Sequence, residues 1–365
     1  YIPPKWAFGY QQSRWSYETA DEIREVAYHF KKHEIPLDSI YLDIDYMQNL
    51  KDFTVDPHKF PDFENLVAEL KEEGIHLIPI IDAGVKAEAG YEIYEEGIKN
   101  GYFIKNEDGT PFEAAVWPGK VHFPDFLNKE TRTWFGMKYK TLIDKGIEGF
   151  WNDMNEPASF NGPLPDDIIF DNDGTIVTHK EIHNVYGHMM DKATYDGIKE
   201  FTGKRPFVVT RACYAGTQKY ATVWTGDNQS TWEHLRMSLP MLMNLGLSGM
   251  AFCGTDVGGF GHDCTAELLS RWVQVGAFTP LFRNHSTIGS REQEPWAFGN
   301  ETEEINRKYI KLQISLYLPK YVYWKIVENR AFLLNLNIIY YVFIYYKNIH
   351  IIKKLKNEKI FMNYK

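Results

Sequence analysis

The sequence predicts an α/β fold of the closed (β/α)8 barrel type, and three observations lead to this class. Short apolar runs end in a charged residue at several points along the chain, and helical patterns separate several of these runs. The chain has 365 residues, 44% of them hydrophobic, so it can bury one large core. In such a barrel the ends of all strands gather on one face, where catalytic side chains sit. Charges at successive strand ends therefore predict a single pocket.

The expected strands follow one another at intervals that leave room for helices. A single acid after a strand is more often the N-cap of the next helix, but here the same layout recurs. Apolar residues at helical spacing, such as Ile23, Val26 and Phe30 behind the acidic first turn at Asp21, indicate helices between the runs. The expected strands are 6–10, 40–45, 76–82, 149–153, 207–211, 222–227 and 250–256, and the expected helices are 19–30, 62–74, 131–145, 183–201, 231–245 and 267–278.

The chain divides into a catalytic barrel at 1–313 and a tail at 314–365. Two insertions, 83–129 and 158–181, are longer than ordinary connections, and such long segments are usually functional. The tail has no proline after Pro319, and Lys, Asn, Ile, Tyr and Phe dominate it, which is typical of translated A/T-rich non-coding DNA or a truncated gene. Its apolar run 331–346 is short and contains two asparagines, so we expect no membrane anchor.

Composition and short motifs exclude several classes of partner. The net charge of −9 and the absence of a basic stripe argue against nucleic acid. The acidic turn at 166–174 lacks the ligand spacing of an EF-hand, and the glycine-rich stretch 257–261 lacks the patterns of a phosphate-binding loop. Neither stretch therefore predicts a site for a metal or for an organic cofactor.

Two carboxylates at strand ends, Asp153 and Asp227, suit the cleavage of a glycosidic bond. In such a reaction an ionised carboxylate attacks or shields an oxocarbenium-like centre, while a protonated one delivers a proton to the leaving oxygen. The nine residues 149–157 carry Asp153 from an apolar strand into a polar loop that ends in proline. The pair specifies this reaction class only if both carboxylates face the same bond, and sequence spacing does not show that.

Several motifs resemble glycoside hydrolase family 31, the α-glucosidase family, and are most similar in style to bacterial α-glucosidases. The resemblance covers about Trp6 to Tyr309, in the expected order. It rests on the following motifs: Asp43-Ile44-Asp45-Tyr46-Met47, Trp117-Pro118-Gly119, Trp151-Asn152-Asp153-Met154-Asn155-Glu156-Pro157, the stretch Arg211 to Gln218, Trp224-Thr225-Gly226-Asp227, Gly254 to Phe260, and Arg283-Asn284-His285.

The resemblance implies roles for individual residues. Asp153 would be the nucleophile and Asp227 the general acid/base of a retaining mechanism with a covalent intermediate. Asp43, Arg211 and His285 would bond the hydroxyls of the glucose unit, and Asp256 would contact the sugar or a residue that touches it. An apolar wall would be formed by Ile44, Ile80, Trp117, Trp151, Trp224, Phe260 and Phe282.

The resemblance also implies parts that this sequence lacks. Family members carry a β-sandwich domain before the barrel and β-domains after it. The family's eighth barrel strand lies beyond the last barrel helix, and this chain diverges near Gln313 before reaching such a segment. We therefore expect an incomplete barrel, without its eighth strand and without flanking β-domains.

The function implied is a retaining exo-α-glucosidase that acts on malto- or isomalto-oligosaccharides. α-Xylosidase, α-glucan lyase and transglucosidase activities stay open as alternatives, as does a truncated fragment without activity. The expected partner is the oligosaccharide itself, and a homo-oligomer stays open. Three cysteines without metal-like spacing, Cys213, Cys253 and Cys264, indicate reduced thiols, so the cytoplasm is the expected compartment.

Overall fold

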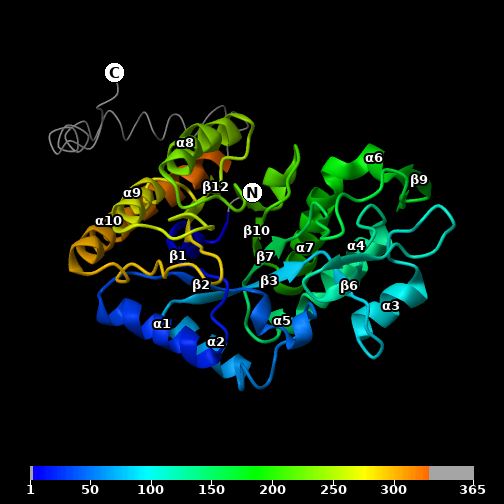
Figure 1. Ribbon diagram of the computed structural model, residues 1–365, viewed down its shortest axis with the longest axis horizontal. Helices are drawn as coiled ribbons and strands as arrows, with labels where there is room; N and C mark the ends of the chain where they lie inside the picture. The colour runs from blue at the N-terminus through cyan, green and yellow to red at the C-terminus, as the bar shows by residue number, and fades with distance from the viewer. Residues whose placement is uncertain (1–2, 329–365) are drawn as a thin grey trace.

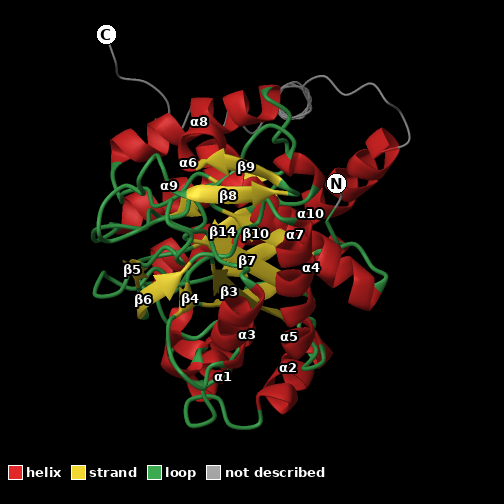
Figure 2. Ribbon diagram, turned by 90° about the vertical axis from the view of Figure 1, so that its right-hand side faces the viewer, coloured by secondary structure: helices red, strands yellow, loops and turns green. Residues whose placement is uncertain are grey.

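The computed structural model describes residues 3–328. Its centre is a sheet of nine parallel strands in the order β12-β11-β10-β7-β3-β2-β1-β14-β13. Helices surround this sheet on its outer side (Figures 1 and 2). The strands are β1 (Tyr10–Gln12), β2 (Ser39–Leu42), β3 (His76–Asp82), β7 (Gly149–Asp153), β10 (Phe207–Thr210), β11 (Thr222–Trp224), β12 (Cys253–Gly254), β13 (Asp256–Val257) and β14 (Phe282–Asn284).

The sheet runs round nearly to its own beginning, which confirms the (β/α)8 barrel. Strands β12 and β13 are two pieces of one extended segment, separated only by Thr255, and they pair with β11 and β14 respectively. The expected absence of the eighth strand is wrong, because β14 fills that position and pairs in parallel with β1. Sequence reasoning missed β14 because it is only three residues long and carries two polar residues.

The outer helices lie where apolar residues recur at helical spacing. Thr19, Thr231 and Thr265 cap α1, α8 and α9, each side chain accepting a hydrogen bond from a backbone N–H of the first turn. Six of the expected helices are present with shifted ends. The helices around the barrel are α1 (Ala20–Lys32), α2 (Phe63–Glu72), α4 (Lys129–Lys138), α5 (Lys140–Ile143), α7 (Tyr186–Thr202), α8 (Trp232–Leu247), α9 (Ala266–Gly276) and α10 (Asn300–Glu328).

The secondary structure differs from expectation at both ends of the barrel region. Residues Lys5–Phe8 form a 3-10 helix, so the first strand starts at Tyr10. Helix α10 continues past residue 313, where the tail was expected to begin, and it packs against α9 and the first 3-10 helix. Within residues 3–328 no helix is both long and apolar enough to cross a membrane. The apolar run 331–346 lies outside the described residues.

The two insertions form small structures of their own beside the barrel (Figure 1). The first contains a three-stranded antiparallel sheet in the order β4-β6-β5, and the second contains a β-hairpin. A β-bridge between Lys105 and Ile169 joins the two insertions. Their elements are β4 (Val85–Lys86), α3 (Glu92–Asn100), β5 (Ala114–Val116) and β6 (Gly119–His122) in the first, and β8 (Ile169–Asn172), β9 (Thr175–Thr178) and α6 (His179–Ile182) in the second.

Helices α4 and α7 approach each other closely through two glycines. A Cβ atom added to Gly197 would lie 2.2 Å from the carbonyl oxygen of Gly136, and one added to Gly136 would lie 2.7 Å from that of Ala193. No side chain fits between the backbones at this crossing. The contact supports the outer side of β7, the strand that ends in Asp153.

Candidate active site

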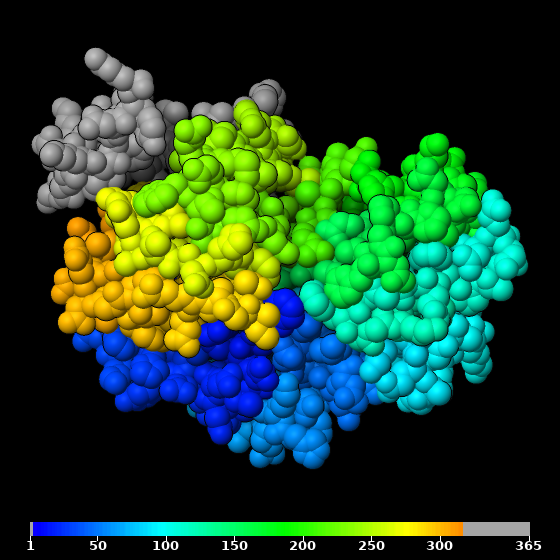
Figure 3. Space-filling model, viewed as in Figure 1, coloured from blue at the N-terminus to red at the C-terminus, as the bar shows by residue number. Residues whose placement is uncertain are grey.

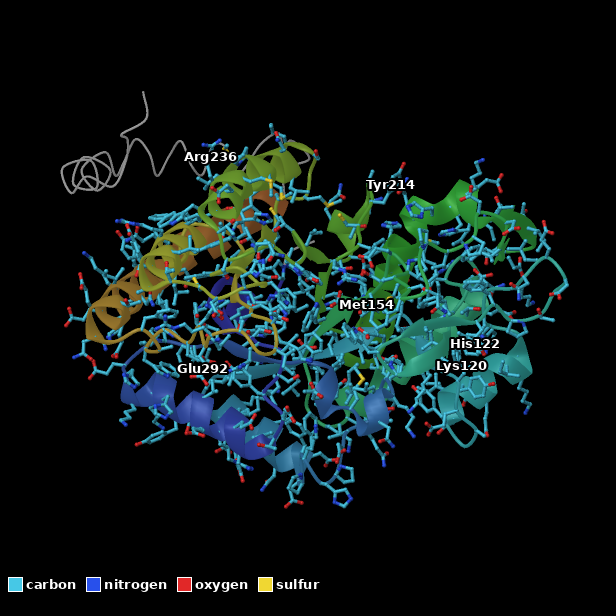
Figure 4. All side chains as sticks on the ribbon, viewed as in Figure 1. Lys120, His122, Met154, Tyr214, Arg236 and Glu292 are labelled. Atoms are coloured by element: carbon cyan, nitrogen blue, oxygen red, sulfur yellow. The ribbon has the colours of Figure 1, made fainter. Side chains whose placement is uncertain are left out.

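The alternation of side chains along β7 decides which of its residues reach the pocket. Phe150 packs on Tyr139 and Asn152 donates a hydrogen bond to Asp191 of α7, so both point to the helices. Trp151 and Asp153 therefore point into the barrel. The next residue, Met154, lies near the middle of the molecule in Figure 4. Segments from the beginning, middle and end of the described chain meet near the centre of the face that Figure 3 shows.

Arg211 brings the two proposed catalytic carboxylates together. It follows β10, and its Nη1 lies 3.0 Å from Oδ1 of Asp153 and 3.8 Å from Oδ2 of Asp227. Its other face is held by Glu156, whose two carboxylate oxygens accept hydrogen bonds from Nε at 2.8 Å and from Nη2 at 2.9 Å. Both acids thus lie on one guanidinium group, whose direction is fixed by a two-point contact.

The two carboxylates differ in their surroundings. The side chain of Asp153 is 12% exposed and that of Asp227 is 46% exposed. Burial raises the pKa of Asp153 to about 6, although Arg211 opposes the rise by stabilising the anion. At neutral pH Asp153 is therefore mostly ionised, while Asp227 is open to solvent.

Asp43 and His285 lie close together, after the ends of β2 and β14. Nε2 of His285 lies 3.9 Å from Oδ2 of Asp43, and Nδ1 of the same ring is within 2.7 Å of the hydroxyl of Ser13. Burial and the neighbouring Arg283 hold the pKa of His285 well below its usual value, so the ring is neutral at pH 7. The pair can therefore both donate hydrogen bonds to the hydroxyls of a sugar and accept hydrogen bonds from them.

Aromatic rings pack around these polar groups at the ends of the strands. Trp151 contacts His285 edge-on at 5.1 Å and Trp224 at 5.7 Å, and Phe260 stacks on His285 at 5.0 Å. Ile80 pairs with Trp151 across the strands β3 and β7, and Ile44 is buried in the turn after Asp43. Their placement fits the expected apolar wall.

Trp117 lies apart from this group, in the turn between β5 and β6 of the first insertion. Its side chain is 37% exposed, and its ring contacts Trp15 at 4.9 Å and Phe160 at 4.7 Å. These three aromatic residues come from the loop after β1 and from both insertions, so they join three separate segments.

Asp256 lies deeper, in an ion pair with Arg283. Nη2 of Arg283 is 2.7 Å from Oδ1 of Asp256, and neither side chain has any solvent exposure. The guanidinium carbon also lies 4.8 Å from the ring centres of both Trp151 and Trp224. Asp256 therefore contacts Arg283, and Arg283 in turn packs against both indole rings.

Phe282 does not lie in the pocket, contrary to expectation. Its ring contacts Tyr10 at 4.9 Å and fills the space over Gly276 of α9, where an added Cβ would meet it at 2.5 Å. Since side chains alternate along β14, Arg283 and His285 point inward and Phe282 points to the helices. The prediction that Phe282 belongs to the apolar wall is wrong because the register of β14 was unknown.

Two further residues belong to the site although the sequence reasoning gave them no role. Glu156 holds Arg211, and Asp82 ends β3 directly opposite Asp153. The second had a readable signal, because it is a charged residue at the end of an expected strand. Among the described residues, no group of three or more His, Cys, Asp or Glu side chains is arranged to hold a metal ion.

Residues 1–323 match the model of the glycosyl hydrolases family 31 TIM-barrel domain. The chain belongs to glycosyl hydrolase family 31. It is 58% identical over 321 residues to an α-glucosidase 2 of Bacillus thermoamyloliquefaciens, a match that covers 87% of this chain and 41% of that protein. The family assignment made from the motifs is thus confirmed.

Solved structures of family members have the same fold. A crystal structure of a glucosidase II α subunit bound to Glc1Man2 gives a TM-score of 0.84 at 36% identity, covering 88% of this chain and 35% of that one. A dextranase of Flavobacterium johnsoniae in complex with glucose gives 0.83 at 33% identity, covering 88% and 41%. The chain thus spans less than half the length of these relatives.

Proposed function

We propose that this chain carries the catalytic centre of a retaining exo-α-glucosidase that releases glucose from malto- or isomalto-oligosaccharides. The observation that carries the proposal is the contact of Asp153 and Asp227 with one nitrogen of Arg211, at 3.0 and 3.8 Å. These distances limit the separation of the two carboxylates and fit the separation of about 5–5.5 Å that retaining enzymes use.

In the first step Asp153 attacks the anomeric carbon of the terminal glucose, and the bond to the leaving oxygen breaks. Asp227 gives its proton to that oxygen, so the sugar leaves as a neutral alcohol. In the second step Asp227 takes a proton from water, and the water oxygen displaces Asp153 from the anomeric carbon. Two displacements return the original α configuration and restore both carboxyl groups.

The same residues explain why Asp153 attacks and Asp227 transfers protons. Arg211 keeps Asp153 anionic inside a pocket whose burial opposes charge. Asp227 is the more exposed acid, so it can reach water in the second step. Asp43 and His285 would bond hydroxyls of the glucose unit, and a wrong epimer would leave their buried polar groups unpaired.

The test is glucose release from maltose and isomaltose by the purified chain, with Asp153→Ala as the comparison. We expect the variant to lose at least about 10⁴-fold in kcat because the covalent step is lost. Proton NMR of the first product should show α-glucose before mutarotation. Initial β-glucose, or release that survives in Asp153→Ala, would contradict the proposal.

Other activities of the same family stay candidates because one structural relative is an α-xylosidase from a soil metagenome, with 28% identity and a TM-score of 0.81. Product analysis separates them, since a xylosidase releases xylose, a lyase releases an anhydro-sugar, and a transglucosidase forms longer oligosaccharides. A fragment without activity would release nothing from any of these substrates.

The compartment and the assembly also stay proposals. The cysteines Cys213, Cys253 and Cys264 are free thiols, which supports a reducing compartment such as the cytoplasm. Fractionation of cells that express the native gene would check this. Sedimentation of the purified chain would show whether it forms a homo-oligomer.

A further inference from the structure

Asp82 is a buried acid beside the nucleophile that has no role in the steps above. It is the last residue of β3, and its Cα pairs with that of Asp153 across the parallel strands β3 and β7. The residue is 4% exposed, and its Oδ1 is buried without a hydrogen-bond partner among the described residues. A buried carboxylate without partners is costly, whereas a buried carboxylic acid costs far less.

A second acid lies directly behind Asp82. Asp52, which is 2% exposed, accepts a hydrogen bond at 2.9 Å from the backbone N–H of Asp82. The backbone carbonyl of Asp52 accepts a hydrogen bond from the hydroxyl of Tyr91. The backbone of β3's last residue is therefore held by a side chain from the loop after β2.

The charged and titratable groups that face Asp82 come from four segments. They are Asp43 after β2, Asp52 in the following loop, Asp153 at the end of β7 and Arg211 after β10, with the phenol of Tyr46 nearby. Arg211 is the cation that acts on Asp82, and it is already bonded to Asp153 and Glu156. One guanidinium group cannot balance all these carboxylates.

The ionisation of the two hidden acids follows from this arrangement. Burial raises the pKa of Asp82 well above its usual value, and the negative charges of Asp52 and Asp153 raise it further. Burial also raises the pKa of Asp52 to about 8. In contrast, Asp153 has the direct contact to Arg211 that keeps it ionised.

We propose that Asp82 stands beside the nucleophile as a neutral carboxylic acid, a positioning residue that fills the space next to Asp153 with a polar group and adds no charge there. The inference rests on the proposed role of Asp153 as the nucleophile. If Asp82 were an anion, it would compete for Arg211 and disfavour the anionic form of Asp153. Because Asp82 is neutral, Arg211 stays paired with Asp153, the carboxylate that reacts.

Two substitutions separate this role from simple packing. Asp82→Asn keeps the shape and hydrogen-bonding capacity of a neutral acid, so we expect kcat/KM within about threefold of wild type and an acidic limb at the same pH. Asp82→Ala removes the hydrogen-bonding group, and we expect a loss of about tenfold or more, chiefly in kcat. Equal losses in the two variants would overturn the proposal.

The pH profile gives the sharper result. If Asp82 carried a charge, Asp82→Asn would remove a negative neighbour and move the acidic limb to lower pH by about one unit or more. Such a shift would also overturn the proposal. Asp38→Asn is the matched control, because Asp38 is a partly buried acid that accepts a hydrogen bond from the backbone of Tyr10 at the opposite end of the strands.

A measurement without substrate distinguishes failure of this inference from failure of the proposed function. Infrared spectra of the protein with ¹³C-labelled aspartate are recorded at pH 7 for wild type and Asp82→Asn. The difference spectrum should contain the carbonyl band of one carboxylic acid that the variant lacks. A carboxylate band in its place would refute the neutral acid, whether or not the chain releases glucose.

Discussion

Arg283 and Asp256 form an ion pair of 2.7 Å in which neither side chain has any solvent exposure. The pair joins β13 and β14, the two strands that close the barrel beside β1. Burial raises the pKa of Asp256 to about 7 even though Arg283 opposes the rise. Each partner therefore offsets the free-energy cost of burying the charge of the other.

Removing one partner of this pair should destabilise the barrel strongly. We expect Arg283→Met to lower the free energy of unfolding by about 3–5 kcal/mol, because Asp256 would be left buried without its cation. Urea denaturation followed by tryptophan fluorescence measures the change. Arg236→Met on the exposed face of α8 (Figure 4) is the control and should change it by less than about 0.5 kcal/mol. A similar small effect for Arg283→Met would contradict the prediction.

Glu156 should be needed for the direction of Arg211. Glu156→Gln replaces two charge-assisted contacts by weaker ones, so we expect kcat/KM to fall by about 10–100-fold. The thermal midpoint should change little, since the Glu156 side chain is 40% exposed. Steady-state kinetics together with a melting curve checks both parts, and a variant with wild-type kinetics would show that Arg211 is held without Glu156.

The acidic limb of the rate profile should report Asp153. Its pKa of about 6 means that the anion needed for attack is lost as the pH falls through 6. We expect kcat/KM to fall about tenfold per pH unit below this value. Measurements from pH 4 to 8 check this. A limb centred near pH 4 would mean that Arg211 outweighs burial.

The crossing of α4 and α7 should not tolerate a methyl group. We expect Gly197→Ala to lower the free energy of unfolding by about 1–3 kcal/mol, because the added Cβ would lie 2.2 Å from the backbone of Gly136. Helix propensity alone favours alanine by about 1 kcal/mol. The sign of the change in unfolding free energy therefore shows whether the steric clash or the helix propensity dominates. Glu200→Ala, exposed on the same helix, is the control for thermal denaturation.

The sequence was sufficient for the fold class, and the family resemblance named residues that lie close together in the structure. Short apolar runs that end in Asp43, Asp153 or Asp227 mark strand ends because hydrophobicity and charge change there abruptly. Most residues that the motifs named converge in space, but Trp117 lies apart from the others and Phe282 points to the helices. Its orientation depends on the register of a three-residue strand, which no local pattern specifies.

What the sequence could not show are relationships between distant side chains. The contact of Glu156 with Arg211 and the pairing of Asp82 with Asp153 depend on which strands are neighbours. The eighth strand was missed for a related reason, since its pairing with β1 comes from closure of the ring and not from its own composition. Long-range pairing of this kind leaves little trace in hydrophobic periodicity.

Closure of the ring between β1 and β14 has a consequence for synthesis of the protein. Tyr10 leaves the ribosome long before Phe282. One edge of β1 therefore stays unpaired while more than two thirds of the chain is translated. The contact of Ser13 with His285 forms only after that wait. We expect nascent chains stalled before β14 to bind chaperones and to be cut by proteases, and the catalytic pocket to appear as the last event of folding.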